Sequence, residues 1–390
     1  MRVLQVIPSV SIVHGGPSRV LVLLEQGLCA QGVSVTTATT DDDGPACRLE
    51  IAASREAHGA KRIYFRKWFD FYKVAPAMLP WLWRNIRTFD VVHIHSLFSF
   101  ASVAAGLIAI GRGVPYIIRP LGTLSHYGRT QRRPWLKRLS LAVLESRILG
   151  RAAAVHFTSE AERQEAKLIN LPLRGIVIPL GAQAEPRGDV QRLLQDDAKL
   201  GHHQIVLYLS RLDPKKNIEG LLRAFAAVRS QQDDVVLMIA GDGQPAYVRK
   251  LKRLAQALDI EPHVVWLGHV ANARKAAAFA AAQVFVLPSL SENFGIAGVE
   301  AMLAGVPCIF GQGVAIARDS MRAGASMTVT SEPESIARAL MDLLADKPRQ
   351  EAMGRRAREF AEREYSVQAM ASRLVALYRQ ICRENGREVL

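Results

Sequence analysis

Cysteine, phosphate-binding signatures and long apolar runs are all scarce or absent in this sequence of 390 residues. Its four cysteines form no CxxC pair and have no metal-ligand spacing, which excludes a disulfide framework and favours a reducing compartment. Neither the dinucleotide fingerprint G-x-G-x-x-G nor a Walker-type Gly-Lys-Ser/Thr loop occurs. The common nucleotide-binding loops are therefore excluded.

Secretory and membrane-spanning segments are not expected either. The longest uncharged stretch, residues 91–111, contains His93 and His95 and is too polar for a spanning helix. The apolar start of the chain is short and broken by Pro8, so it predicts a buried strand rather than a signal peptide. A cytoplasmic location is expected.

Length and charge narrow the class further. A chain of 390 residues with 49% hydrophobic and 22% charged residues is globular and too long for one ordinary core, so two domains are expected. The net charge, 50 basic minus 36 acidic residues, is +14. Residues 1–180 contain 23 basic and 12 acidic residues, or +11, which leaves +3 for the rest. A basic first half favours an anionic partner, such as a membrane surface, a nucleic acid or a phosphorylated substrate.

Short β-branched runs alternate with helical patterns along the whole chain. The expected strands are 3–7, 33–37, 91–94, 116–118, 154–157 and 175–178, then, after a polar bridge at 181–201, 205–209, 235–240, 264–267, 284–287 and 308–310. Two such series predict two parallel sheets with helices on both faces. Ligands of such sheets bind beyond the carboxyl ends of strands, and a cleft between the two domains is expected to hold them.

Three loops at strand ends contain candidate binding residues. Gly15-Gly16 precedes a helix and suits either a phosphate at a helix N-terminus or an ordinary tight turn capped by Ser18. Arg211 and Lys216 follow the strand 205–209, where two cations suit a diphosphate.

The third loop contains paired acids. Glu292 lies after the strand 284–287, and Glu300 lies on the apolar helix behind it. Carboxylates at this edge can accept hydrogen bonds from sugar or ribose hydroxyls. A helix-capping role explains Glu292 equally well but leaves Glu300 unexplained.

The ordered set of motifs resembles a known family. The Arg211 to Lys216 loop, residues 240–243, residues 267–270 and the Glu292/Glu300 pair resemble, in order and spacing, the retaining glycosyltransferases of family four, and Gly15-Gly16 and residues 90–95 resemble its N-terminal elements. The resemblance implies an α/β chain of the GT-B class, with two facing Rossmann-like domains, an interdomain cleft and no metal or cofactor. It implies an acceptor domain at 1–185, joined by a C-terminal helix at about 366–390, and a nucleotide-sugar domain at 186–365.

The resemblance also implies roles for the matched residues. Arg211 and Lys216 would neutralise the donor diphosphate, and Glu292, with the Phe294-Gly295 backbone, would contact the donor sugar. The remaining donor residues are Glu300 for the ribose, Gly16 for the phosphates and Val270 for the base.

The acceptor side departs from the family pattern. Many relatives have a histidine where this chain has Leu121. His95, Arg119 and His126 are the acceptor-side candidates, although a packing role suits His95 equally well. His93 and His95 are expected on opposite faces of their strand, unable to share a metal.

Three further segments have alternative interpretations. Asp41-Asp42-Asp43 contains a D-x-D spelling known from metal-dependent glycosyltransferases, but a solvated turn is favoured. The segments 61–87 and 129–151 interleave aromatic and basic residues, which favours contact with an anionic membrane over aromatic packing beneath a solvated basic face.

The expected function is therefore retaining, metal-independent transfer of a hexose from a nucleotide diphosphate to a glycan or lipid-linked glycan. Such an enzyme would serve cell-surface polysaccharide synthesis at the cytoplasmic membrane face. A nucleotide-sugar epimerase or a phosphorylase of the same fold is the alternative among enzymes. A non-catalytic polyanion-binding protein is the alternative outside them, although no nucleic-acid module is found.

Overall fold

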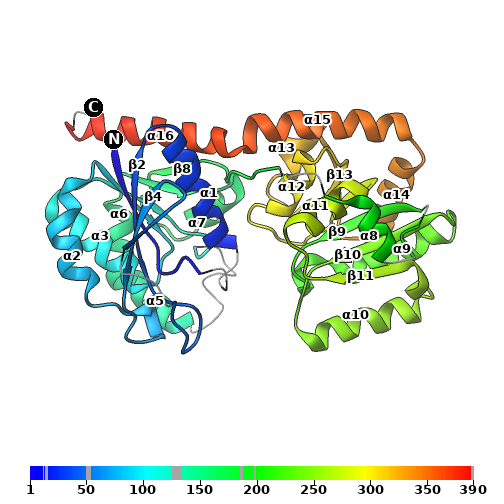
Figure 1. The fold of residues 1–390 in the computed structure, drawn as a ribbon, viewed down its shortest axis with the longest axis horizontal. Helices are drawn as coiled ribbons and strands as arrows, with labels where there is room; N and C mark the ends of the chain where they lie inside the picture. The colour runs from blue at the N-terminus through cyan, green and yellow to red at the C-terminus, as the bar shows by residue number, and fades with distance from the viewer. Residues whose placement is uncertain are drawn as a thin grey trace. The chain divides into compact units, whose positions relative to one another are not determined.

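The chain folds into two compact units. The structure, a computed structural model, describes residues 1–11, 13, 16–49, 54–124, 134–184, 188–196, 199–201 and 203–387. Unit 1 comprises Met1–Gly181 and Val367–Leu390, and unit 2 comprises Ala182–Ser366 (Figure 1). The last helix of the chain therefore belongs to the same unit as the first strand.

Unit 1 is built on an eight-stranded sheet with the order β3-β4-β2-β1-β5-β6-β7-β8. Its strands are β1 (Arg2–Val6), β2 (Ser34–Thr40), β3 (Ser54–Ala57), β4 (Ala60–Phe65), β5 (Val91–His95), β6 (Tyr116–Arg119), β7 (Ala154–Phe157) and β8 (Gly175–Val177). All neighbouring strands run parallel except β3 and β4, which form an antiparallel pair at one edge. This hairpin was not expected from the sequence because β3 is mostly polar and exposed and therefore has no apolar run.

Helices cover both faces of this sheet. They are α1 (Gly16–Ala30), α2 (Met78–Asn85), α3 (Phe100–Arg112), α5 (Pro134–Ser140), α6 (Ser146–Gly150), α7 (Glu160–Lys167) and α16 (Val367–Glu384). Local chemistry sets the ends of α3: Ser99 Oγ accepts from the Ser102 amide, and Gly113 ends the helix at φ 66°.

Helix α16 completes the core of unit 1 (Figure 1). Its Leu374 and Tyr378 are fully buried in the same cluster as Val3 of β1 and Leu24 of α1. At Gly27 of α1, an added Cβ would lie 2.8 Å from Val367 Cγ1, so the two helices approach each other too closely for a larger side chain there.

Unit 2 contains a six-stranded parallel sheet with the order β11-β10-β9-β12-β13-β14. Its strands are β9 (Gln204–Leu209), β10 (Val235–Ala240), β11 (Val264–Gly268), β12 (Val284–Leu287), β13 (Cys308–Gly311) and β14 (Ser326–Val329). Its helices are α8 (Val190–Asp196), α9 (Ile218–Arg229), α10 (Pro245–Ala257), α11 (Asn272–Ala281), α12 (Ile296–Leu303), α13 (Ala317–Arg322), α14 (Pro333–Leu344) and α15 (Lys347–Tyr365). The central strands β9, β10 and β12 are almost entirely buried, as their continuous apolar runs require.

The aspartate run at 41–43 is not a solvated turn, so that expectation was wrong for its middle residue. Asp42 is fully buried. Its Oδ1 lies 2.5 Å from Lys67 Nζ and 2.6 Å from Lys73 Nζ. The two lysines neutralise this carboxylate, which explains why it remains in the interior.

A π-helical turn with a buried acid separates α5 from α6. Between α5 and α6 the chain forms a π-helical turn, Leu141–Glu145, which ends on the fully buried Glu145. Glu145 Oε1 accepts from the Phe98 amide at 2.9 Å and from the Tyr72 hydroxyl at 3.2 Å. Burial raises the pKa of this carboxyl to about 7, against the opposing effect of these hydrogen bonds.

The raised pKa of Glu145 predicts a pH-dependent loss of stability. The folded state binds this proton more tightly than the unfolded state, so the stabilisation is full below about pH 4.5 and is lost as pH rises through about 7. In Glu145→Gln, the loss of unfolding free energy between low and neutral pH should be smaller than in the wild type by about 1–3 kcal/mol. Thermal unfolding from pH 5 to 8 measures it, with the exposed Glu56→Gln as control. If the stability of Glu145→Gln fell with pH as steeply as that of the wild type, the raised pKa of Glu145 would not be the cause.

Candidate active site

The carboxyl edge of the unit 2 sheet gathers the loops that follow its six strands. The strands β9 and β12 are neighbours, and the connection after β9 leads to β10 on one side, whereas the connection after β12 leads to β13 on the other. At such a switch point the loops on the two sides diverge and leave a crevice that commonly binds ligands. The predicted loops of Arg211–Lys216 and Glu292 follow β9 and β12, the two strands that flank it.

A charged pair spans this switch point. Lys216, only 4% exposed, ends the short 3₁₀ turn Pro214–Lys216, and its ammonium contacts the carboxylate of Glu292. The Leu290 amide donates to the Lys215 carbonyl at 2.8 Å and holds the two loops together. The structure therefore brings together two residues that are 76 positions apart (292 − 216 = 76).

Lys216 lies in an environment that weakens its hold on a proton. Burial and, to a smaller extent, the positive charges of Lys215 and Arg211 lower the pKa of its ammonium to about 7, against the opposing effect of Asp213. An arriving anion would favour the charged form. A buried lysine of this kind at a sheet edge is typical of a functional site.

Two glycines allow the loops to pack this closely. Gly241 follows β10 with φ 141°, and an added Cβ would lie 1.9 Å from the Ser210 carbonyl oxygen of the β9 loop. Gly295 precedes α12 with φ 89°, and an added Cβ would lie 3.0 Å from Val314. Both positions therefore require a residue without a side chain.

The other predicted donor residues lie in the same unit. Arg211 is exposed after β9. Val270, after β11, is 8% exposed, and Phe294 is 5% exposed with its ring edge against Tyr365 at 5.5 Å. The side chains of Val270 and Phe294 therefore pack into the interior of unit 2. Because its ring is buried, Phe294 offers a ligand mainly its backbone groups.

A second buried ion pair, Lys275 with Glu300, was not anticipated from the sequence. Glu300 is on α12 and Lys275 on α11, and Lys275 Nζ lies 2.8 Å from Glu300 Oε1. Both side chains are at least nine-tenths buried. The only sign of this pair in the sequence is a single lysine in an alanine-rich helix, and that lysine alone does not show that Glu300 is its partner.

In unit 1, the expected phosphate loop begins α1. Gly16 is the first residue of this helix, is exposed, and has no atom within 4 Å of an added Cβ. Gly15 lies outside the described residues. Ser18 is buried, and its hydroxyl donates to the Ser11 carbonyl at 2.7 Å, which ties the start of the helix to the loop after β1.

His93 and His95 share one face of β5, so the expectation of opposite faces was wrong. Side chains two residues apart in a strand point to the same side, and these rings lie 4.3 Å apart. His93 Nδ1 lies 2.7 Å from the Tyr378 hydroxyl, and the His95 ring contacts the Gln5 amide. Burial lowers the pKa of both histidines well below the ordinary value, which keeps them neutral.

The acceptor-side candidates His95 and Arg119 are fully buried. Among the described residues, no hydrogen-bond partner is found for the three guanidinium nitrogens of Arg119, and burial lowers its pKa to about 10. Leu121 follows at φ 58°, and the Gly122 amide donates to Glu162 Oε1 at 2.7 Å. His126 lies outside the described residues.

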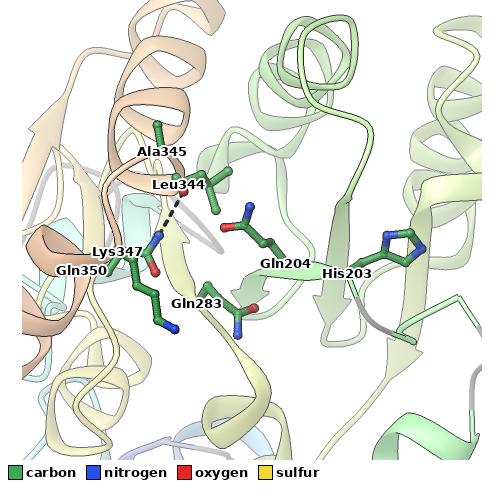
Figure 2. A pocket seen from close by; sticks show the side chains of 7 residues that line it. All are labelled: His203, Gln204, Gln283, Leu344, Ala345, Lys347 and Gln350. Carbon is green, nitrogen blue, oxygen red and sulfur yellow. Dashed lines mark hydrogen bonds between the residues drawn. The ribbon is translucent and has the colours of Figure 1, made fainter.

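Figure 2 shows a groove of about 390 Å³ at the opposite edge of the unit 2 sheet, near the amino ends of β9 and β12. Two of its polar side chains bind backbone groups. Gln283 Oε1 accepts from the Ile205 amide at 2.5 Å, and Gln350 Nε2 donates to the Leu343 carbonyl at 2.8 Å. The groove is therefore separate from the switch-point site.

The described residues form neither a cluster of metal ligands nor a membrane-spanning helix. Within them, no group of three or more His, Cys, Asp or Glu side chains is arranged to hold a metal ion. None of the helices that these residues form is both long and apolar enough to cross a membrane.

Two family models match the chain, one on each unit. Residues 15–181 match the glycosyl transferase 4-like domain, and residues 190–360 match the glycosyl transferases group 1. The chain belongs to the group 1 glycosyltransferases. The resemblance drawn from the loop motifs is therefore confirmed at the level of the family.

Solved structures confirm the fold class of this group 1 glycosyltransferase. HepE of Anabaena, in complex with UDP, superimposes with a TM-score of 0.76 at 19% identity, covering 97% of this chain and 100% of that one. Such neighbours have the GT-B fold of two parallel-sheet α/β domains, as expected.

Two curated relatives of this group 1 glycosyltransferase are named after a lipid. An alpha-monoglucosyldiacylglycerol synthase of Streptococcus pneumoniae is 36% identical over 34% of this chain and 31% of its own length. A phosphatidyl-myo-inositol mannosyltransferase of Mycobacterium leprae is 28% identical over 77% of this chain and 75% of its own. The chain spans about a third to a half of the length of the first curated relatives it matches.

Proposed function

We propose that this protein transfers a hexose from a nucleotide diphosphate to a lipid-linked or glycan acceptor at a membrane surface, with retention of configuration and without a metal ion. The contact between Lys216 and Glu292 across the switch point carries this proposal. The relatives named as lipid glycosyltransferases support the class of acceptor.

The two cations of the β9 loop serve the leaving group. The bond from the anomeric carbon to the donor phosphate oxygen breaks, a bond to the acceptor oxygen forms on the same face, and the acceptor proton passes to the departing phosphate. Arg211, exposed at the edge, and Lys216, buried beneath it, stabilise the charge that develops on the diphosphate.

The remaining donor contacts follow from position. Glu292 and the Phe294-Gly295 backbone contact the sugar, Glu300 accepts from the ribose, and Val270 borders the base. On the acceptor side, His95 and Arg119 end β5 and β6 and are fully buried, so they act through the loops that follow these strands and do not touch the acceptor.

A ridge of exposed apolar residues on unit 1 suits a lipid surface. Trp135, Leu139 and Val143 lie four residues apart along α5 and the π-helical turn, and each is 58–66% exposed. Exposed Arg138 and Arg147 flank the ridge. Helices with such a pattern of apolar and basic residues lie in the plane of an anionic membrane interface.

A second apolar segment adjoins this ridge. Trp68, Phe69 and Phe71 are each at least half exposed, and the neighbouring Tyr72 hydroxyl lies 2.6 Å from Ser140 Oγ. By contrast, Trp81 of the expected membrane segment packs against Phe65 at 5.6 Å. The proposed docking residues therefore lie within the two segments that the sequence indicated, and Trp81 is not among them.

Loss of either cation should slow transfer. Arg211→Ala and Lys216→Ala should lower kcat/KM about 10²–10³-fold and weaken nucleotide diphosphate binding, because both stabilise the leaving group. A thermal-shift panel of UDP, GDP, ADP and CDP identifies the base first, and steady-state kinetics follow. Arg358→Ala, at an exposed pair on α15, is the control.

Near-normal turnover in both variants would overturn the diphosphate assignment. In the same assay EDTA should leave the wild-type rate unchanged. Inhibition by EDTA that a divalent ion relieves would overturn metal independence.

The two acids should separate in kinetics. Glu292→Ala should mainly lower kcat, because its contact is to the reacting sugar. Glu300→Gln should mainly raise the donor KM, because ribose contacts exist in ground and transition states alike. Glutamine is preferred to alanine here, since it still accepts a hydrogen bond from the buried Lys275. Equal effects of both variants on kcat would contradict the division of roles.

Membrane binding should contain two components. Loss of the apolar ridge should remove the part of vesicle binding that resists salt; the variant is Trp135→Ala/Leu139→Ser/Val143→Ser. Reversal of the flanking charges should remove the part of vesicle binding that salt screens; the variant is Arg138→Glu/Arg147→Glu. Co-sedimentation with phosphatidylglycerol-containing and pure phosphatidylcholine vesicles across a salt series measures both. Met321→Ser, at an exposed apolar residue of unit 2, should bind as the wild type does. Unchanged binding in both multiple variants would exclude this face.

A further inference from the structure

The buried pair of Lys275 and Glu300 joins the two helices on either side of β12. Helix α11 (Asn272–Ala281) precedes this strand and α12 (Ile296–Leu303) follows it. The Lys275 side chain is 3% exposed and that of Glu300 is 9% exposed, with 2.8 Å between Nζ and Oε1. The two charges are therefore almost entirely removed from water.

A buried ion pair is a poor way to stabilise a fold. The cost of dehydrating both charges commonly cancels their attraction, and apolar residues of similar volume often serve as well. The neighbours of Lys275 on α11 include Ala276, Ala277 and Ala278, which pack without any charge. Stability alone therefore does not account for a lysine at this position.

Glu300 lies near the proposed donor site. In a helix the side chains lean toward the N-terminus, which for α12 is Gly295, directly after the Glu292 loop. A carboxylate that accepts from ribose hydroxyls must remain ionised and correctly oriented while it is mostly buried. An ammonium 2.8 Å from one of its oxygens meets both needs.

We propose that Lys275 is a positioning residue that holds Glu300 ready to accept from the ribose hydroxyls and thereby makes the site selective for ribonucleotides over 2′-deoxyribonucleotides. This inference rests on the proposed ribose role of Glu300. Lys275 acts through Glu300 and does not itself touch the reacting atoms.

The test compares ribo- and 2′-deoxyribonucleotide binding. Calorimetry with the best-binding of UDP, GDP, ADP and CDP, and with its 2′-deoxy form, gives the selectivity as a ratio of Kd values. The wild type should favour the ribonucleotide about tenfold or more, as expected for a hydrogen bond to a charged group. Lys275→Met should weaken ribonucleotide binding, leave deoxyribonucleotide binding nearly unchanged, and bring the ratio below about threefold. Its donor KM should rise with little change in kcat, since ribose contacts persist in the transition state.

Matched variants guard against a merely structural effect. Arg274→Met alters the exposed neighbouring cation on α11 and should retain the wild-type ratio. Lys275→Met/Glu300→Gln removes both charges, so it should fold even where Lys275→Met does not. This double variant should match Glu300→Gln alone in its ratio, because the lysine has no route except through Glu300.

Three results would count against the proposal, and they differ in what they overturn. If Glu300→Gln lowers the ratio but Lys275→Met keeps it, or lowers both affinities by the same factor, only the role of Lys275 fails. If Glu300→Gln also keeps the ratio, the ribose role of Glu300 fails with it. If the wild type binds no nucleoside diphosphate, the proposed function fails as well.

Discussion

The shared direction of the unit 2 strands is the constraint on which the candidate site depends. Because all six strands are parallel, every loop that leaves a carboxyl end reaches the same edge of the sheet. Arg211, Val270 and Glu292 are far apart in sequence but follow β9, β11 and β12 at that edge. Backbone hydrogen bonds then join the loops, as between the Gly241 amide and the Gly268 carbonyl at 2.7 Å. The sheet places the chemical groups, and the glycines let their loops approach one another.

The sequence predicted the strands and loops well because their signals are local. Runs such as Val235–Ala240 are apolar throughout, and their ends are marked by turn residues. The pairing of Lys275 with Glu300 escaped prediction because it joins two helices through tertiary packing. The π-helical turn at Glu145 and the edge hairpin of β3 and β4 also depend on neighbours that no periodicity reveals. His126, which lies outside the described ranges, remains a prediction from its place in the sequence near Leu121.

The buried ion pairs of unit 1 do not contribute to the basic excess of the first 180 residues. Arg62 forms a buried pair with Glu25 at 2.5 Å, Lys67 contacts Asp42 and Asp70, and Lys73 also contacts Asp42. These three cations and three acids cancel in the net charge. The excess of +11 therefore lies on other residues, among them the exposed Arg138 and Arg147, and electrostatic attraction to an anionic surface depends on those residues.

The return of α16 to unit 1 has a consequence for biosynthesis. The ribosome completes residues 182–366 before it makes α16, so unit 2 has its whole sequence while unit 1 still lacks a helix. Until α16 emerges, Val3, Leu24 and Val91 have no cover on that face, and His93 lacks the hydroxyl of Tyr378. The first half of the chain to be translated is thus the last to become a finished domain, and its apolar surface awaits the end of synthesis.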